Sequence, residues 1–239
     1  LSKDYYNPRE IKNKISSAKN AIMSVEDFSK VEFDHKVVEV YKIYTKKLKQ
    51  GNSVDFDDLL ILPIKLFKTY PNVLEEYQDR YKYILIDEYQ DTNEAQYTFS
   101  KILASKYRNI FVVGDNDQAI YAFRGANYKN ILNFEKDYPE AKSVVLEENY
   151  RSTKTILNAA NDVIKNNKER KSKNLWSNKP VGDKITYKLV GTEKEEASFV
   201  ADEIKSLLEQ GVKEEDIAVL YRTNAQSRVV EEYMLKKNI

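Results

Sequence analysis

The 239-residue chain carries 39 basic and 38 acidic side chains, so its net charge of +1 excludes a basic field over the whole molecule as the basis of nucleic-acid binding. Cysteine is absent and His35 is the single histidine, which excludes a disulfide framework, thiolate catalysis and a histidine-based triad or metal cluster. No apolar run approaches the roughly 20 residues of a membrane helix, and we expect a cytoplasmic protein with no membrane partner.

The first part of the chain is predicted to be helical. From about Pro8 to Asn52 no clear strand pattern occurs. Apolar side chains recur there at helix spacing, namely Phe33, Val37, Val40, Tyr41, Tyr44 and Leu48. We therefore expect residues 1–55 to be part of a helical subdomain.

Residues 56–146 alternate helical and strand patterns, as a parallel sheet covered on both faces does. A helix is expected at 57–70, where Pro63 should bend it or start a new turn. Strands are expected at Tyr83–Ile86, Ile110–Val113 and Ser143–Leu146.

Residues 147–239 read as the start of a second α/β domain, with residues 147–149 as the hinge. A helix is expected around residues 156–164, and strands at Ile185–Val190 and Ile217–Tyr221. Between these strands, Thr192 and Glu195 form a plausible capping box for a helix that ends near Gly211.

A first motif follows the strand at Tyr83–Ile86, which ends in Asp87 and Glu88. Carboxylates at the carboxyl edge of a parallel sheet suit Mg²⁺ binding beside nucleotide phosphates and the activation of water, with Asp87 on the metal and Glu88 on the water. The alternative is that Asp87 or Asp91 only caps the helix expected from about Asn93.

A second motif follows the strand at Ile110–Val113, where Gly114 lets the chain turn into a polar run that ends at Gln118. Tyr121, Phe123 and Arg124 come next, a combination used to stack the bases of single strands. Core packing of the two rings is the alternative.

A third motif is Asn149, Tyr150 and Arg151, just before a helix that Ser152 or Thr153 could cap. The planar guanidinium of Arg151 suits contact with phosphate oxygens across a domain boundary. A surface salt bridge is the alternative.

A basic run also stands out, and Glu169 is its one nearby acid. We interpret it as a solvated helix end and loop, with phosphate contact as the alternative. Its members are Lys165, Lys168, Arg170, Lys171, Lys173 and Lys179.

Taken in this order, the motifs DEYQDT, GDNDQAIYAFRGA and ENYRST resemble motifs II, III and IV of the UvrD/Rep/PcrA family of superfamily 1 DNA helicases, nearest to its PcrA branch in low-GC Gram-positive bacteria. DFDDLL at residues 55–60 and LYRTNAQSR at 220–228 resemble flanking blocks of the family.

The resemblance implies a fold, a reaction and a cofactor pair. The fold would be the P-loop NTPase (RecA-like) core of helicase domain 1A, at 56–146, after part of subdomain 1B and before the start of domain 2A. The parent would be an ATP-dependent, Mg²⁺-requiring 3′-to-5′ DNA helicase of repair and replication. Single-stranded DNA and duplex junctions would be its substrates, and repair or replication-initiator proteins its candidate partners.

Site residues are implied one by one. Asp87 would bind Mg²⁺, Glu88 activate water, Gln118 sense the γ-phosphate, Tyr150 stack on adenine and Arg151 act as the arginine finger. On the DNA side, the resemblance implies contacts by Phe56, Tyr121, Phe123, Arg124, Arg222 and Asn224. Phe123 stands where the family usually has Trp, and Ala119 where it usually has Ser.

The sequence contains no GxxxxGK[ST] phosphate loop, because none of its six glycines precedes a lysine. We therefore expect an internal fragment of a larger enzyme that is inactive alone. A naturally short protein that has lost its motor is the alternative for its origin. Two functional alternatives are a single-stranded-DNA-binding module without catalysis and the motor of a RecB-like helicase-nuclease.

Overall fold

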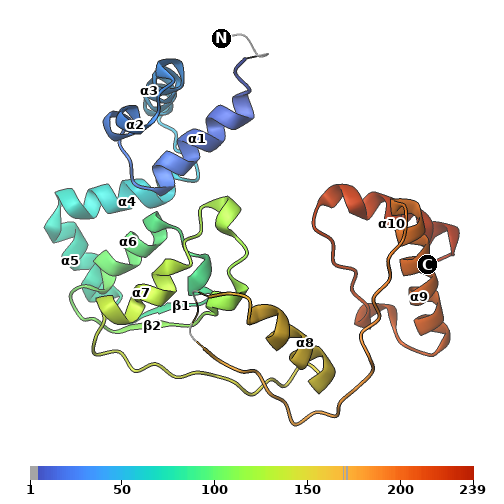
Figure 1. Ribbon diagram of the computed structural model, residues 1–239. Helices are drawn as coiled ribbons and strands as arrows, with labels where there is room; N and C mark the ends of the chain where they lie inside the picture. Colours follow the sequence, from blue (N-terminus) through green and yellow to red (C-terminus); the bar gives the residue numbers. More distant parts are fainter. Residues whose placement is uncertain (1–4, 169, 171) are drawn as a thin grey trace. The chain divides into compact units, whose positions relative to one another are not determined.

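The computed structural model describes residues 5–168, 170 and 172–239, which divide into two compact units after Pro180 (Figure 1). The sequence pattern placed a domain boundary after Leu146 instead, and that boundary stays a prediction. Glu169 and Lys171 of the basic run lie outside the described residues.

Three helices open the first unit: α1 (Pro8–Asn20), α2 (Val25–Val31) and α3 (His35–Gln50). Each helix is capped by a side chain that accepts a hydrogen bond from a free backbone N–H of the first turn. Asn7 caps α1, Ser24 caps α2 and Asp34 caps α3. Their shared core consists of Ile11, Ile15, Ala18, Phe28, Val37 and Tyr41.

The helical prediction for this part is confirmed, with one error in its apolar set. Val37 and Tyr41 are buried as the helix spacing indicates, but Phe33 is 93% exposed. Phe33 precedes the first turn of α3, so the helix spacing does not apply to it.

The central part of the unit holds a small parallel sheet, in which β1 (Ile84–Ile86) pairs with β2 (Ile110–Val112) and Ile84 lies opposite Ile110. Helix α4 (Asp58–Thr69) packs on α5 (Pro71–Arg80) and on α6 (Glu94–Ala104), and α6 contacts β1. Helix α4 continues through Pro63, so no new element starts there.

Helix α7 (Lys129–Asp137) packs near the end of β1, and α8 (Lys154–Ile164) follows the third motif (Figure 1). Short 3₁₀ turns lie after the strands, at η1 (Tyr89–Asp91), η2 (Asn116–Gln118) and η3 (Ala122–Arg124).

The third expected strand, Ser143–Leu146, does not form, and that prediction is wrong. Val144 and Leu146 remain 79% and 78% exposed. A strand exists only where backbone groups find partners, and here pairing begins one residue later, because Asn149 N–H donates to Trp176 O at 2.7 Å and Trp176 N–H donates to Glu147 O at 3.0 Å. The pairing is a single parallel bridge between Glu148 and Trp176.

In the second unit, α9 (Glu193–Glu209) packs against α10 (Asn224–Lys236), and the turn η4 (Glu214–Asp216) lies between them in sequence. Thr192 caps α9 as expected, but the Glu195 carboxylate accepts from Gly191 N–H at 2.8 Å rather than from Thr192. The helix is followed by Gly211, whose φ of +89° is left-handed.

Neither strand expected in the second unit forms. Residues 185–190 and 217–221 are extended but unpaired, and Tyr187, Leu189 and Leu220 are 85%, 80% and 95% exposed. Their sequences have the apolar, β-branched character of strands, but the described part of the chain offers them no neighbouring strand to pair with.

Candidate functional site

The acid pair lies where β1 ends. Asp87 and Glu88 are both exposed, and the Asp87 carboxylate accepts from Glu88 N–H at 2.8 Å. Glu88 has a left-handed backbone, with φ of +49° and ψ of +44°, a conformation that costs a non-glycine residue roughly 1–2 kcal/mol and is concentrated at functional sites. The strained turn therefore presents both carboxylates at the sheet edge.

The alternative of helix capping by Asp87 or Asp91 is wrong. Helix α6 is capped by Asn93, whose side chain accepts from Gln96 N–H at 2.9 Å, while the Gln96 side chain accepts from Asn93 N–H at 3.0 Å. Because this capping box is complete, the two aspartates are not needed for the helix.

Gln90 connects the two strand ends, a role that the sequence motifs did not reveal. Its side chain is 1% exposed, donates to the Glu88 carboxylate at 2.8 Å and accepts from Asp115 N–H at 2.9 Å. The one available signal was its place inside the DEYQDT run. Gln90 thus links the acid pair of β1 to the loop after β2.

Gly114 has a different role from the one expected. Its φ is not in the left-handed region, so no unusual turn requires a glycine. A Cβ at this position would instead lie 2.6 Å from the Gln90 side-chain oxygen and 2.8 Å from Ile131 Cδ1. Gly114 therefore permits close packing of the two strand ends.

The loop after β2 is built around Asp115. Its carboxylate accepts from Asp117 N–H at 2.9 Å and from the Gln118 side-chain amide at 2.8 Å, and also pairs with the Lys173 ammonium. Burial works against the charged form, but the hydrogen bonds from Lys173 and Gln118 outweigh it and hold the pKa of Asp115 below its ordinary value. The predicted γ-phosphate sensor, Gln118, is thus oriented by an ionised partner.

Tyr121, Phe123 and Arg124 form one cluster on the surface. The two rings lie 6.0 Å apart between centroids, and the Arg124 guanidinium carbon lies 5.3 Å from the Tyr121 centroid and 5.5 Å from that of Phe123. Tyr121 is 38% and Phe123 68% exposed, so neither ring belongs to the core. The arrangement offers stacking surface and positive charge to an outside ligand.

The third motif is ordered by Asn149, whose side-chain oxygen accepts from Arg151 N–H at 3.0 Å and from Ser152 N–H at 2.7 Å. Thr153 stands at the helix start without a side-chain cap bond. The Tyr150 hydroxyl donates to the Glu148 carboxylate, which raises the pKa of Tyr150. Both Tyr150 and Arg151 are exposed and open to a ligand.

The remaining predicted DNA contacts belong to other segments of the chain. Phe56 is 89% exposed and lines a groove of about 910 Å³ with apolar side chains of α1 and α3. Arg222 and Asn224 are exposed at the start of α10, in the second unit. The first unit brings together the strand-end residues. Phe56 lines a separate groove of that unit, and Arg222 and Asn224 belong to the second unit.

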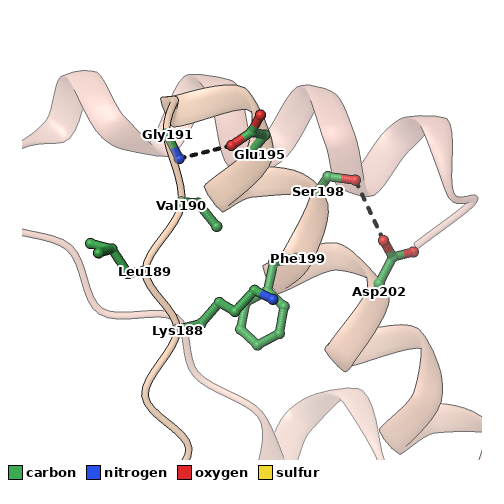
Figure 2. Close-up of a pocket in the computed structure, with 8 residues that line it drawn as sticks. All are labelled: Lys188, Leu189, Val190, Gly191, Glu195, Ser198, Phe199 and Asp202. Atoms are coloured by element: carbon green, nitrogen blue, oxygen red, sulfur yellow. Dashed lines mark hydrogen bonds between the residues drawn. The ribbon is translucent and has the colours of Figure 1, made fainter.

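Another hollow lies on the second unit beside α9 (Figure 2). Its lining includes Glu195, whose carboxylate accepts a hydrogen bond from Gly191 N–H, and Ser198, whose hydroxyl donates to the Asp202 carboxylate at 3.4 Å. Acidic side chains fill the first turn of α9, where a phosphate would otherwise be attracted. None of the predicted site residues lines this hollow, and its charge does not suit a nucleotide.

The described residues offer few metal ligands. They contain no cluster of three or more histidine, cysteine or acidic side chains able to hold a metal ion by themselves. Among them, no helix has the length and apolar character to cross a membrane. Any metal at Asp87 would need most of its ligands from elsewhere.

An acid pair at the end of one parallel strand, joined to an amide-bearing loop at the end of the next, is typical of α/β proteins of the P-loop NTPase class. The chain belongs to the UvrD-like helicase family, whose fold is of that class. The UvrD/REP helicase N-terminal domain matches residues 1–139, and the UvrD-like helicase C-terminal domain matches residues 144–239.

Two staphylococcal proteins illustrate the relationship. The chain is 53% identical to the ATP-dependent DNA helicase PcrA of Staphylococcus aureus and 52% identical to that of Staphylococcus epidermidis, over 98% of its own length. It spans 32% of each of those proteins, about a third of their length.

Proposed function

We propose that this chain is part of an ATP-dependent DNA helicase that moves 3′ to 5′ on single-stranded DNA and unwinds duplexes in repair and replication. The observation that carries the proposal is the hydrogen-bonded path from Glu88 through Gln90 to Asp115 and Gln118. This path connects a water-activating carboxylate to a phosphate-sensing amide, the two functions that NTP hydrolysis requires.

The strand-end residues fit the cofactors that the family implies, ATP and Mg²⁺. Magnesium takes oxygen ligands and is commonly held by one or two carboxylates together with substrate phosphates. Asp87 offers such a carboxylate, exposed at the end of β1. When bound, the metal would neutralise charge on the phosphates.

In the proposed reaction, Glu88 orients the attacking water and accepts its proton. Gln118 donates a hydrogen bond from its side-chain amide to the terminal phosphate. Tyr150 offers its exposed ring to the adenine. Arg151 supplies positive charge to the phosphates, and the five N–H donors of its planar guanidinium suit that contact.

In the proposed domain arrangement, residues 1–55 belong to helical subdomain 1B, 56–146 to RecA-like domain 1A and 147–239 to domain 2A. Closure of the cleft between the two RecA-like domains would carry Arg151 towards Glu88 and Gln118. Tyr121, Phe123 and Arg124 lie a few residues from Gln118, so a shift in that loop would reach the DNA-binding surface. Phe56, Arg222 and Asn224 would complete the contacts with the strand.

The proposal is tested in the full-length protein that carries this sequence. Glu88→Gln should lower the single-strand-stimulated kcat for ATP at least about 100-fold, because proton acceptance by the carboxylate is lost. Glu94→Gln, an acid in the first turn of α6, is the matched control and should leave kcat unchanged. Equal turnover by Glu88→Gln and the parent protein would reject the assignment.

The 239-residue chain itself is proposed to lack ATPase and unwinding activity, because its sequence has no phosphate loop to hold the β- and γ-phosphates. ATP turnover by the purified chain that disappears in Glu88→Gln would contradict this. Cytoplasmic location and contact with repair or replication-initiator proteins complete the proposal.

A second candidate function, single-strand binding without catalysis, is favoured by the exposed Tyr121–Phe123–Arg124 cluster. The chain should then bind single-stranded DNA weakly and with strong salt dependence, measured by fluorescence anisotropy. Tyr121→Ala should weaken binding by about 10-fold, whereas Tyr187→Ala, which removes a more exposed ring of the second unit, should not. Equal loss in both variants would argue against this surface.

A further inference from the structure

Two cations of the basic run are not solvated but lie against the loop after β2. Arg170 forms a bidentate pair with Asp117, with Nε to Oδ1 at 3.0 Å and Nη2 to Oδ2 at 2.7 Å. Lys173 pairs with Asp115 and lies 3.7 Å from Asp117 Oδ2. The side chains of Arg170 and Asp117 are 13% and 7% exposed, so this pair is largely withdrawn from water. The interpretation of Arg170 and Lys173 as solvated charges is wrong.

These contacts join segments far apart in sequence. Arg170 and Asp117 are 53 residues apart, and Lys173 and Asp115 are 58 residues apart. Arg170 also donates to Lys173 O at 3.1 Å, which ties the two residues to each other. Because the bidentate geometry fixes both distance and orientation, Arg170 and the loop after β2 are held in one arrangement.

The loop that they hold contains the residues of the hydrogen-bonded path. Asp115 accepts from Lys173 through Oδ1 and from the Gln118 amide through Oδ2, while its own N–H is bonded to Gln90. Asp115 alone therefore separates Lys173 from Gln118, and it likewise separates Lys173 from the Gln90 side chain that binds Glu88. Displacement of Asp115 would therefore shift Gln118 at one end of the path and, through Gln90, Glu88 at the other.

We propose that Arg170 and Lys173 are positioning residues that fix the Asp115–Gln118 loop, and through it the Gln118 amide, for the terminal phosphate. The inference rests on the proposed function and extends it to residues outside the recognised motifs. Both cations are neutralised by carboxylates, which leaves them poorly suited to bind nucleic-acid phosphates. Their effect on hydrolysis is indirect, because neither touches the predicted catalytic groups Glu88 or Gln118.

The kinetic test uses the full-length protein with Arg170→Ala, Asp117→Ala and the double variant. Misplacement of a reacting group by about 1 Å can lower a rate about 100-fold, so we expect kcat for ATP to fall at least about 10-fold in each single variant, with KM changed less than about 3-fold. The double variant should lose no more than either single one, because both remove the same contact. Lys168→Ala, an exposed cation of the same run, is the control and should match the parent protein.

A readout that needs no activity separates this inference from the proposed function. In the 239-residue chain, ¹⁵N-labelled NMR spectra should show the Gln118 side-chain amide and the Asp115 N–H shifting in Arg170→Ala and Lys173→Ala but not in Lys168→Ala. Unchanged resonances, or an unchanged kcat in a full-length protein whose Glu88→Gln variant is inactive, would overturn the positioning role. If the parent protein hydrolyses no ATP although the resonances move, the proposed function fails and the loop contact stands.

Discussion

At the residue scale, Gly114 marks the closest approach between the two strand ends. Its Cα lies against Gln90 and Ile131 so tightly that a methyl group would enter contacts below 3.0 Å. The same approach lets Gln90 reach both Glu88 and Asp115. The absence of a side chain at Gly114 therefore allows both the close packing of the two strand ends and the hydrogen bonds of Gln90 that connect them.

Gly114→Ala should destabilise the first unit by about 1–3 kcal/mol, the usual cost of overpacking. Urea unfolding followed by the fluorescence of Trp176 measures this loss. Gly51→Ala is the matched control, because its added Cβ would come no closer than 3.4 Å to any neighbour and its φ of −82° suits alanine. Equal midpoints for the two variants would contradict the packing role.

Asp55 provides a test of pH dependence. Burial opposes its charge, but the Lys19 ammonium, Asp58 N–H and the Tyr44 hydroxyl outweigh it and lower the pKa of Asp55. Since the folded pKa lies below that of the unfolded chain, the unfolded chain binds more protons. The stabilisation is thus complete above the unfolded pKa of about 4 and lost as pH falls through the folded pKa.

The Asp55→Asn variant should therefore show a flatter decline in free energy of unfolding between about pH 5 and pH 2 than the parent chain. Denaturant titrations at a series of pH values measure both slopes. Parallel curves for the two chains would show that Asp55 contributes nothing to acid sensitivity.

At the element scale, one buried lysine joins the opening helices to the segment before α4. Lys19 of α1 is 5% exposed in its side chain and pairs at 2.7 Å with both Asp55 and Asp58. The neighbouring Asn20 side chain donates to Asp57 at 3.0 Å and accepts from Asn93 at 2.7 Å, next to the turn that carries the acid pair. The helical part is thus tied by polar contacts to the sheet-edge motif.

Lys19→Met should destabilise the first unit by about 3–5 kcal/mol, because it leaves two partly buried carboxylates without a cation. Lys30→Met is the control: its pair with Asp27 is exposed, with side chains 72% and 55% accessible, and such solvent-exposed pairs contribute little to stability. Chemical denaturation of both variants compares the two losses. Similar small losses would mean that the Lys19 network does not hold these elements together.

At the scale of the whole molecule, three segments with strand-like sequences find no sheet to pair with in the part of the chain that the structure describes. The segments at residues 185–190 and 217–221 lie extended and exposed in the second unit, and residues 143–146 do so in the first. Exposed apolar side chains such as Leu220 and Tyr187 are costly in water and favour burial in a larger assembly. The unpaired, exposed segments agree with a chain that spans about a third of the length of its relatives.

Hydrogen exchange should distinguish the unpaired segments of the 239-residue chain from the same segments in the full-length protein. In the 239-residue chain the amides of residues 185–190 and 218–221 should exchange almost as fast as in an unfolded peptide, because they lack ladder partners. In the full-length protein, pairing into a sheet should slow them by about 100-fold or more. Equally fast exchange in both would argue against a second RecA-like sheet built from these segments.

Local sequence determined the helices, the apolar runs that are able to form strands and the types of residue at their ends. Asn7, Ser24, Asp34 and Asn93 cap helices through hydrogen bonds within a few residues, and Asp87, Glu88 and Gln118 follow strand ends as the apolar runs predicted. Such features depend on neighbours close in the chain, so sequence patterns reveal them.

Tertiary structure alone decided which distant groups meet. The bridging role of Gln90, the close approach at Gly114 and the pairs of Arg170 and Lys173 with Asp117 and Asp115 join separate segments, and no local pattern encodes those distances. It also decided which apolar runs become strands, because a strand is stable only when another backbone completes its hydrogen bonds. Ile84–Ile86 found that partner in Ile110–Val112, and residues 143–146 did not.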